Sequence, residues 1–347
     1  MTETAVFLRA FGGPECLQVG QAEPPVPAPD QMLVRIAACG VCGHDLANRA
    51  GHFPHTKLPA IMGHEVAGTV EQVGPLVTGF AVGDRVAMIQ RLPCGLCHLC
   101  RSGRENVCTS GQGFYGEDLA GGYGSHVIAS ARNAVKLPDE IPLEIACTLS
   151  CAIGTGYHAL RRADLDVGET VVVTGSSGGV GLHTVKLARL AGLRVIAVSS
   201  SEAKAERLTD AGADEVVIAP DMRFHKQVRD LTGGIGCHGV IEIAGRPTFE
   251  SSVRALRSGG RMVVVGNVDP GPVPFNPAMA ILRELEFMGS AHATRSDLEH
   301  VVDLVASGKI TPEIAGSLPL EDAAEAHRRM EARSTSGRMV LVHGATG

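Results

Sequence analysis

A β-branched run, a glycine-rich turn and a helical pattern follow one another near the middle of the chain. Residues 171–175 read VVVTG, the turn SSGGVG follows over 176–181, and apolar residues then recur at helical spacing to Leu190. This order is typical of a dinucleotide-binding βα unit, where glycines let the backbone approach the pyrophosphate and the helix N-terminus offers N–H groups to it. Ser176 replaces the first glycine of the usual fingerprint. The predicted cofactor-binding residues of this turn are Ser176, Gly178, Gly179, Val180 and Gly181.

A lone glycine fingerprint is weak evidence, because an ordinary turn can carry the same letters. Here a second β-branched run, 194–199, arrives at the spacing that a βαβ unit requires. The first strand is expected at 170–174, and further strands are expected at 215–218, 239–243 and 261–266, with helical patterns between them. This alternation predicts an α/β fold with a doubly wound parallel sheet, a Rossmann domain, over residues 153–290.

The segments on either side of residues 153–290 have a different sequence pattern. Residues 1–152 carry short β-like runs punctuated by Gly and Pro, which predicts a mostly antiparallel, barrel-like lobe. Residues 291–347, with a helix expected at 297–306 and a strand at 337–342, are expected to return to that lobe. A chain of 347 residues with 44% apolar content is long enough for two cores. We expect the active site to lie between the two domains.

Charge and hydropathy limit the partners. The formal net charge is −6, without the excess of positive charge that nucleic-acid-binding proteins carry, so nucleic acid is not an expected partner. No apolar stretch reaches the length of a membrane span, and charge near the N-terminus is unlike a signal peptide. The expected location is the cytoplasm.

Four of the ten cysteines lie within fifteen residues, in the loop 93–109. Cys94, Cys97, Cys100 and Cys108 have the spacing of a closed structural zinc site. Disulfides are the alternative, but a chain expected in a reducing compartment more often uses such a pattern to bind metal.

A second group of metal-ligand residues is spread along the chain. Cys42, His64 and Cys151 each lie close to a glycine or small residue at an expected strand end or turn. Two sulfurs and one nitrogen leave a fourth zinc position open, and an open zinc acts as a Lewis acid. Taken singly, each residue could instead be an ordinary buried side chain.

These landmarks together resemble the zinc-containing medium-chain dehydrogenase/reductase family. The resemblance runs through nearly the whole chain and rests on Cys42-x2-Asp45, Gly63-His64-Glu65-x2-Gly68, the run VGDRV at 82–86, the four-cysteine loop, Thr155-Gly156 and the glycine turn. It implies a GroES-like catalytic domain formed by residues 1–152 and 291–347, joined to the Rossmann domain. It also implies two Zn²⁺ per chain, one of them in the loop 93–109.

The resemblance assigns roles residue by residue. Cys42, His64 and Cys151 become catalytic zinc ligands, and Glu65 becomes a carboxylate able to approach the metal. Asp45 becomes the hydrogen-bond partner of the His64 ring, which fixes its tautomer. The resemblance also implies that Thr155 lies behind the nicotinamide ring and that Arg338 reaches the pyrophosphate. Gly266 and Asn267 are expected to approach the cofactor.

One position departs from the alcohol dehydrogenases of the family. They usually carry Ser or Thr two residues after the first cysteine ligand, and a histidine three residues later, as a proton relay. This chain has His44 and Ala47 there. Our hypothesis is that His44 itself transfers the proton, because imidazole titrates near neutrality. The alternative is that His44 only packs against Asp45 or orients it.

The end of the second Rossmann strand bears on cofactor choice. NAD sites place a carboxylate there, whereas this chain reads Ser199-Ser200-Ser201, followed by Glu202 and Lys204. Hydroxyls and a lysine suit a 2′-phosphate, so NADP(H) is expected over NAD(H). Two alternatives stay open: Glu202 could serve NAD, and Ser199 could only cap the next helix.

The expected reaction is hydride transfer between NADP(H) and an alcohol, aldehyde or ketone. Reduction of a C=C bond in an enone, quinone or enoyl thioester is the alternative, because the altered relay and the Gly-Gly-Val-Gly turn also resemble the enoyl and quinone reductase branches. A nucleotide-binding protein without catalysis is a third hypothesis. Leu92, Phe114, Tyr115 and Val268 are expected to line an apolar substrate pocket. A strand around 286–291 could pair across a two-fold axis, so a homodimer or homotetramer is expected.

Overall fold

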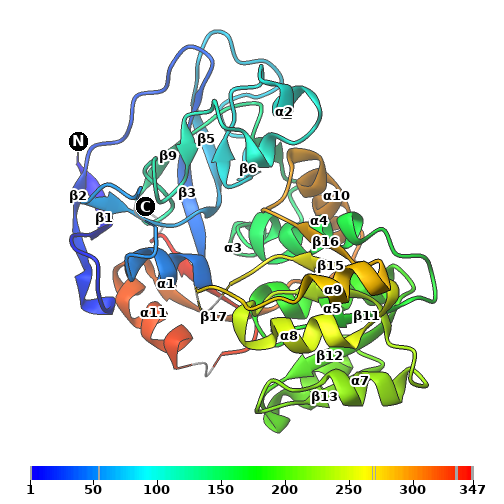
Figure 1. Cartoon of the computed structure of the whole chain (residues 1–347). Coiled ribbons are helices and arrows are strands. Elements are labelled where there is room, and N and C mark those ends of the chain that lie inside the picture. The colour runs from blue at the N-terminus through cyan, green and yellow to red at the C-terminus, as the bar shows by residue number, and fades with distance from the viewer. Residues whose placement is uncertain (1, 54, 268, 270, 333–334, 345–347) are drawn as a thin grey trace. The chain divides into compact units, whose positions relative to one another are not determined.

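The computed structural model describes residues 2–53, 55–267, 269, 271–332 and 335–344 (Figure 1). The chain divides into two compact units. Unit 1 comprises residues 1–154 and 292–347, and unit 2 comprises residues 155–291. Val268, one of the expected pocket residues, lies outside the described residues.

Unit 2 contains a six-stranded sheet in which every pairing is parallel. Its strand order is β13-β12-β11-β14-β15-β16, so the chain runs outward from β11 in both directions. The strands are β11 (Thr170–Val173), β12 (Arg194–Ser199), β13 (Glu215–Ile218), β14 (Cys237–Glu242), β15 (Leu256–Val264) and β16 (Glu286–Gly289). The doubly wound sheet predicted from the sequence is confirmed.

Helices cover both faces of this sheet. Successive side chains of β11 point to opposite faces, and apolar side chains on both faces are covered by helices. Val171 and Val173 pack with α4, α5 and α6, whereas Val172 packs with α7 and α8 on the opposite face. The helices are α4 (Gly154–Ala163), α5 (Gly179–Leu190), α6 (Ala205–Asp210), α7 (His225–Leu231), α8 (Arg246–Ala255) and α9 (Pro277–Arg283). A strand buried on both faces requires the continuous apolar run that the sequence contains.

Unit 1 is built mainly from antiparallel strands. Its largest sheet has the order β10-β6-β5-β3-β18-β17, with β9 also paired to β3. Its strands are β3 (Met32–Val41), β5 (Glu65–Val73), β6 (Arg85–Met88), β9 (His126–Ala129), β10 (Ala134–Lys136), β17 (Ile314–Pro319) and β18 (Arg338–Val342). The C-terminal strand β18 pairs with β3, with Leu341 opposite Cys39. Two smaller sheets contain β1 (Glu3–Leu8), β2 (Leu17–Ala22) and β4 (Ala60–Ile61), and β7 (Arg91–Leu92) with β8 (Gly113–Phe114).

Short helices complete unit 1. They are α1 (Gly43–Arg49), α2 (His98–Arg101), α3 (Leu143–Ala146), α10 (Arg295–Ala306) and α11 (Ala323–Glu331). α10 begins two residues before the predicted start, because Thr294 caps it and exchanges hydrogen bonds with Asp297 in a capping box. Among the described residues, no helix combines the length and the apolar character that crossing a bilayer requires.

Candidate metal centres and nucleotide site

The four clustered cysteines converge in unit 1. Their Sγ atoms all lie within 4.8 Å of one another, and four of the separations are 3.5, 3.6, 3.8 and 3.9 Å. A tetrahedral zinc with sulfur at 2.3 Å requires sulfurs roughly 3.8 Å apart, so the set fits that ion. All ten cysteines are free thiols, which excludes the disulfide alternative in this structure.

Local structure explains how this loop presents its thiols. Sγ of Cys94 accepts hydrogen bonds from the backbone N–H groups of Leu96 and Cys97, which lower the pKa of the Cys94 thiol to about 6. Burial and the neighbouring thiols raise the pKa of Cys100 to about 12. Because zinc binds thiolates, a zinc ion bound here would release the protons of these thiols.

A second group of ligand atoms converges elsewhere in unit 1. Cys42, His64, Glu65 and Cys151 each offer an atom within 4.8 Å of the other three, and all four residues are buried. Cys42 is the N-cap of α1, directly after β3. His64 directly precedes β5, and Glu65 is its first residue. Cys151 lies in the π-helical segment η3 (Leu149–Ile153). Short π-helical segments are frequent at functional sites.

Hydrogen bonds orient the imidazole of this group. Oδ1 of Asp45 is 3.1 Å from Nδ1 of His64, and Oδ2 of Asp45 accepts the backbone N–H of Cys42 at 2.9 Å. Nε2 of His64 is thereby turned toward Sγ of Cys42, 3.2 Å away. Burial alone would lower the pKa of His64, but the charges of Cys42 and Asp45 outweigh it and raise that pKa well above its usual value. Asp45 therefore has the contact that its expected role requires.

Glu65 and Arg338 form a buried ion pair beside the same group. Nε of Arg338 lies 3.1 Å from Oε2 of Glu65, and the side chains are 4% and 0% exposed. Burial raises the pKa of Glu65 to about 7, although Arg338 acts in the opposite direction. A hydrogen bond with the Cys151 thiol also acts to lower this pKa, so the Glu65 carboxylate lies directly beside the ligand group. The structure thus gives Arg338 a contact with Glu65, and its expected contact with the pyrophosphate stays a prediction.

His44 is held by a residue that sequence reasoning did not identify. Its Nε2 lies 2.5 Å from Oε1 of Glu117, 73 positions further along the chain. Asn48, one helical turn after His44 on α1, donates from Nδ2 to the carbonyl oxygen of Gly116 at 2.9 Å. Two neighbouring contacts therefore join α1 to the loop that carries Glu117. Among the described residues, no hydrogen bond joins His44 to the Asp45 carboxylate, and both roles considered for His44 stay predictions.

Aromatic rings surround His44. The Phe53 ring is stacked with its centroid 4.4 Å away, and the Phe114 ring lies 5.1 Å from His44 and 5.3 Å from His64. The ring of His292, which the sequence analysis missed, lies 4.8 Å from Phe114. Of the expected pocket residues, Phe114 is thus near the second ligand group. Tyr115 instead donates its hydroxyl to the carbonyl oxygen of Ile128, within the core of unit 1.

In unit 2, the glycine turn lies between β11 and α5. A side chain at Gly181 would place its Cβ 2.2 Å from the carbonyl oxygen of Gly175, so helix and turn pack at a distance that only glycine permits. Gly178 is the N-cap of α5, and its Cβ would meet only the Gly175 oxygen, at 3.5 Å. Ser176 is buried and donates from Oγ to the carbonyl oxygen of Val198 at 2.7 Å. The serine at the first fingerprint position therefore ties β11 to β12.

The remaining predicted cofactor residues lie at strand ends or at a helix start. Ser199 ends β12 and exchanges hydrogen bonds with the backbone of Ser201, while Ser200 is exposed and Lys204 is partly exposed. Gly266 and Asn267 follow β15, and Thr155 is a buried residue of α4.

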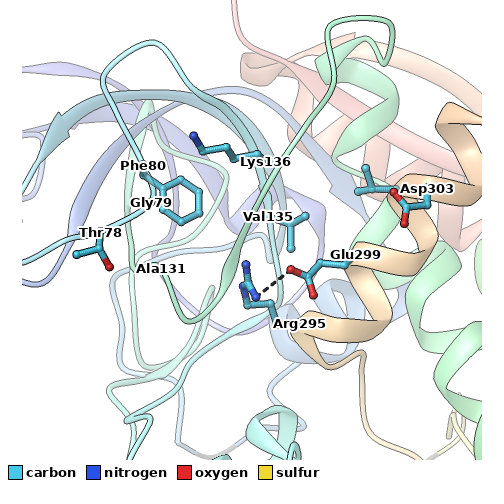
Figure 2. Close-up of a pocket in the computed structure, with 10 residues that line it drawn as sticks. Thr78, Gly79, Phe80, Ala131, Val135, Lys136, Arg295, Glu299 and Asp303 are labelled. Atoms are coloured by element: carbon cyan, nitrogen blue, oxygen red, sulfur yellow. Dashed lines mark ion pairs between the residues drawn. The ribbon is translucent and has the colours of Figure 1, made fainter.

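A separate groove of about 610 Å³ lies elsewhere in unit 1 (Figure 2). Its walls come from the loop at 78–80, from β10 and from α10. Arg295 and Glu299 pair within it at 2.9 Å, and Lys136 pairs with Asp84 at 2.8 Å. None of the predicted site residues lines this groove.

Two family models match the chain. The model described as alcohol dehydrogenase GroES-like domain matches residues 28–139, and the model described as zinc-binding dehydrogenase matches residues 179–307. The chain belongs to the zinc-containing medium-chain dehydrogenase/reductase family, and it is an oxidoreductase with a GroES-like and a Rossmann domain.

Particular relatives point to two chemistries. The chain is 36% identical over 325 residues to an acryloyl-coenzyme A reductase of Metallosphaera sedula, covering 93% of this chain and 96% of the relative. It is similar to the crystal structure of AibC, with 44% identity, a TM-score of 0.93 and coverage of 99% and 96%. It is also similar to a crystal structure of an NAD-dependent alcohol dehydrogenase, with 35% identity, a TM-score of 0.89 and coverage of 98% and 100%.

Proposed function

We propose that this protein reduces the C=C bond of an α,β-unsaturated acyl thioester, using a nicotinamide cofactor and a zinc ion. The observation that carries the proposal is the altered relay position: His44 is bound to Glu117, and Ala47 stands where a relay histidine would be. The similarity to an acryloyl-coenzyme A reductase supports the same chemistry. In the balanced reaction, hydride adds to the β-carbon and a proton to the α-carbon, while NADPH becomes NADP⁺.

The residues of unit 1 fit a catalytic zinc. Cys42, His64 and Cys151 would hold it, and Glu65 offers a further oxygen. When bound, the ion would polarise the carbonyl oxygen of the substrate as a Lewis acid. Asp45 holds His64 in the tautomer that keeps Nε2 free for a metal. The rings of Phe53 and Phe114 lie 4.4 and 5.1 Å from the His44 ring and give this side of the group apolar neighbours.

Reduction of a carbonyl, or oxidation of the corresponding alcohol, is the second candidate. The set of two cysteines and one histidine favours it, because that donor set is the one found in alcohol dehydrogenases. The similarity to the NAD-dependent alcohol dehydrogenase structure points the same way. In this reaction both hydride and proton add to the C=O group, so the substrate would be an aldehyde or ketone.

NADP(H) is the proposed cofactor. β12 ends at Ser199, Ser200 and Ser201 follow it, and Lys204 lies in the short helix Glu202–Lys204. An acidic residue at this position would repel a 2′-phosphate, whereas hydroxyls and an ammonium group attract it. A cytoplasmic location belongs to the same proposal.

Product analysis separates the two reactions. The zinc-loaded protein is incubated with NADPH or NADH and with either an acryloyl or crotonyl thioester or an aldehyde of equal chain length. We expect a saturated thioester and faster turnover with NADPH. If only the aldehyde is reduced, the second candidate replaces the first.

His44 is proposed to replace the missing hydroxyl relay. His44→Ala should lower turnover by about 10²-fold, within the usual range for a general acid, and should change its pH profile. His52→Ala, which removes an exposed histidine of the next loop, is the matched control. An unchanged rate and pH profile in His44→Ala would remove His44 from the mechanism.

A further inference from the structure

Unit 2 contains a buried carboxylate for which the proposed reaction has no use. Glu242 is the last residue of β14 and is fully buried. Within the part of the chain that the structure describes, no cation pairs with it. Its partners are instead three hydroxyl groups and one backbone N–H. A buried carboxyl group costs free energy unless hydrogen bonds satisfy it, and these four hydrogen bonds do so within unit 2.

The hydrogen bonds of Glu242 join elements that are far apart in sequence. Oε1 accepts from Oγ1 of Thr174 at 2.7 Å, from Oγ1 of Thr248 at 2.7 Å and from the N–H of Gly245 at 2.8 Å. Oε2 accepts from Oγ of Ser252. One carboxylate thus holds the end of β11, the loop after β14 and the first turns of α8.

Thr174 extends this network into the loop after β14. Its Oγ1 accepts the N–H groups of Ile243 at 2.9 Å and Ala244 at 3.3 Å, while it donates its proton to Glu242. Thr174 directly precedes Gly175, where the glycine turn begins. The hydroxyl of Thr174 therefore fixes the spacing between the glycine turn and the loop 243–245.

The main chain carries the network to a third strand. The carbonyl oxygen of Glu242 accepts the N–H groups of Val265 at 2.8 Å and Gly266 at 3.3 Å. Gly266 lies so close to Ile243 that a Cβ would be 2.1 Å from the Ile243 oxygen. Around Glu242, the carboxyl ends of β11, β14 and β15 are consequently held together.

We propose that Glu242 and Thr174 are positioning residues for the nicotinamide dinucleotide, which they do not touch. In open parallel sheets, ligands bind outside the carboxyl ends of the strands. The predicted cofactor residues Gly178 and Gly266 lie in two of the joined loops, and Gly181 lies in the first turn of α5. The network holds these loops in the binding conformation before the nucleotide arrives, which lowers the entropic cost of binding. This inference rests on the nucleotide binding that is part of the proposed function.

The test is a binding measurement without acyl or carbonyl substrate. NADPH and NADH are titrated into the full-length zinc-loaded protein, and Kd is followed by nicotinamide fluorescence. Thr174→Val removes the hydroxyl while keeping the shape, and it should raise Kd by about tenfold. Thr174→Ser retains the hydroxyl and should restore Kd to within about twofold of the wild-type value. Thr209→Val removes an exposed threonine hydroxyl on α6 and is the matched control.

Turnover at saturating NADPH separates positioning from general damage. We expect kcat of Thr174→Val to stay within about twofold of wild type while KM for NADPH rises. If Thr174→Val does not fold, Thr248→Val, which removes one donor to Glu242 at the start of α8, should raise Kd in the same direction. An unchanged Kd in the folded variants overturns the inference. A wild-type protein that binds neither nucleotide overturns the proposed function instead.

Discussion

At the scale of single residues, the sequence predicts the ligand atoms better than their surroundings. Cys42, His64 and Cys151 converge as the family pattern implies, and Asp45 reaches His64. Glu117 could not be predicted, because no local pattern links it to His44 across 73 positions. Long-range contacts of this kind depend on how a loop folds, which spacing alone does not encode.

The two glycines that hold the second and third fingerprint positions should respond differently to substitution. Gly181→Ala places a Cβ against the Gly175 backbone and should lower the free energy of unfolding by about 1–3 kcal/mol. Gly178→Ala meets only one atom at contact distance, and Gly178 has φ of −79°, which any residue adopts, so stability should hold while NADPH binding weakens. Thermal unfolding and NADPH titration of both variants check this. Equal stability losses would contradict the packing argument.

At the scale of elements, composition predicts the buried β-branched strands and fails for strands of two residues. β11 and β12 are apolar β-branched runs, and their predicted and observed bounds agree to within a residue. β7 and β8 have two residues each and exist only because they pair with each other, so periodicity cannot find them. In the loop that follows β7, four thiols converge, so we expect a bound metal to contribute to its order.

The four-cysteine loop should therefore lose its structure when its metal is removed. Cys97→Ser should lower the zinc content by one ion per chain and make residues 93–109 sensitive to protease, because structural zinc contributes folding free energy. Cys237→Ser, at a buried cysteine of unit 2, is the control and should keep the metal. Elemental analysis with limited proteolysis provides the measurement. A protease-resistant loop in zinc-depleted Cys97→Ser would show that other contacts order it.

At the scale of the whole molecule, the alternation of strands and helices predicts two units with a discontinuous first unit. The observed units divide at 154/155 and 291/292, against expected boundaries at 152/153 and 290/291. The edge of the parallel sheet is β16, which pairs only with β15 among the described strands and is exposed at Glu286 and Phe287. Ile281 and Leu282 of α9 are also largely exposed, at 72% and 83%.

An exposed strand edge beside exposed apolar side chains favours self-association. We expect a dimer, or a tetramer built from dimers. Leu282→Glu should shift it toward monomer, because a charge would be buried at the contact, whereas Val167→Glu, at another exposed apolar site of unit 2, should not. Light scattering after size-exclusion chromatography measures the mass. A monomeric wild-type protein at every concentration would contradict this expectation.

The zinc content and activity of Cys151→Ser test the central claim most directly. Two ligand groups predict two zinc ions per wild-type chain. Cys151→Ser should retain the ion of the four-cysteine loop, bind the second ion weakly, lose hydride transfer to both thioester and aldehyde, and still bind NADPH with the wild-type Kd. Full activity in a Cys151→Ser protein that holds one zinc per chain would contradict the account.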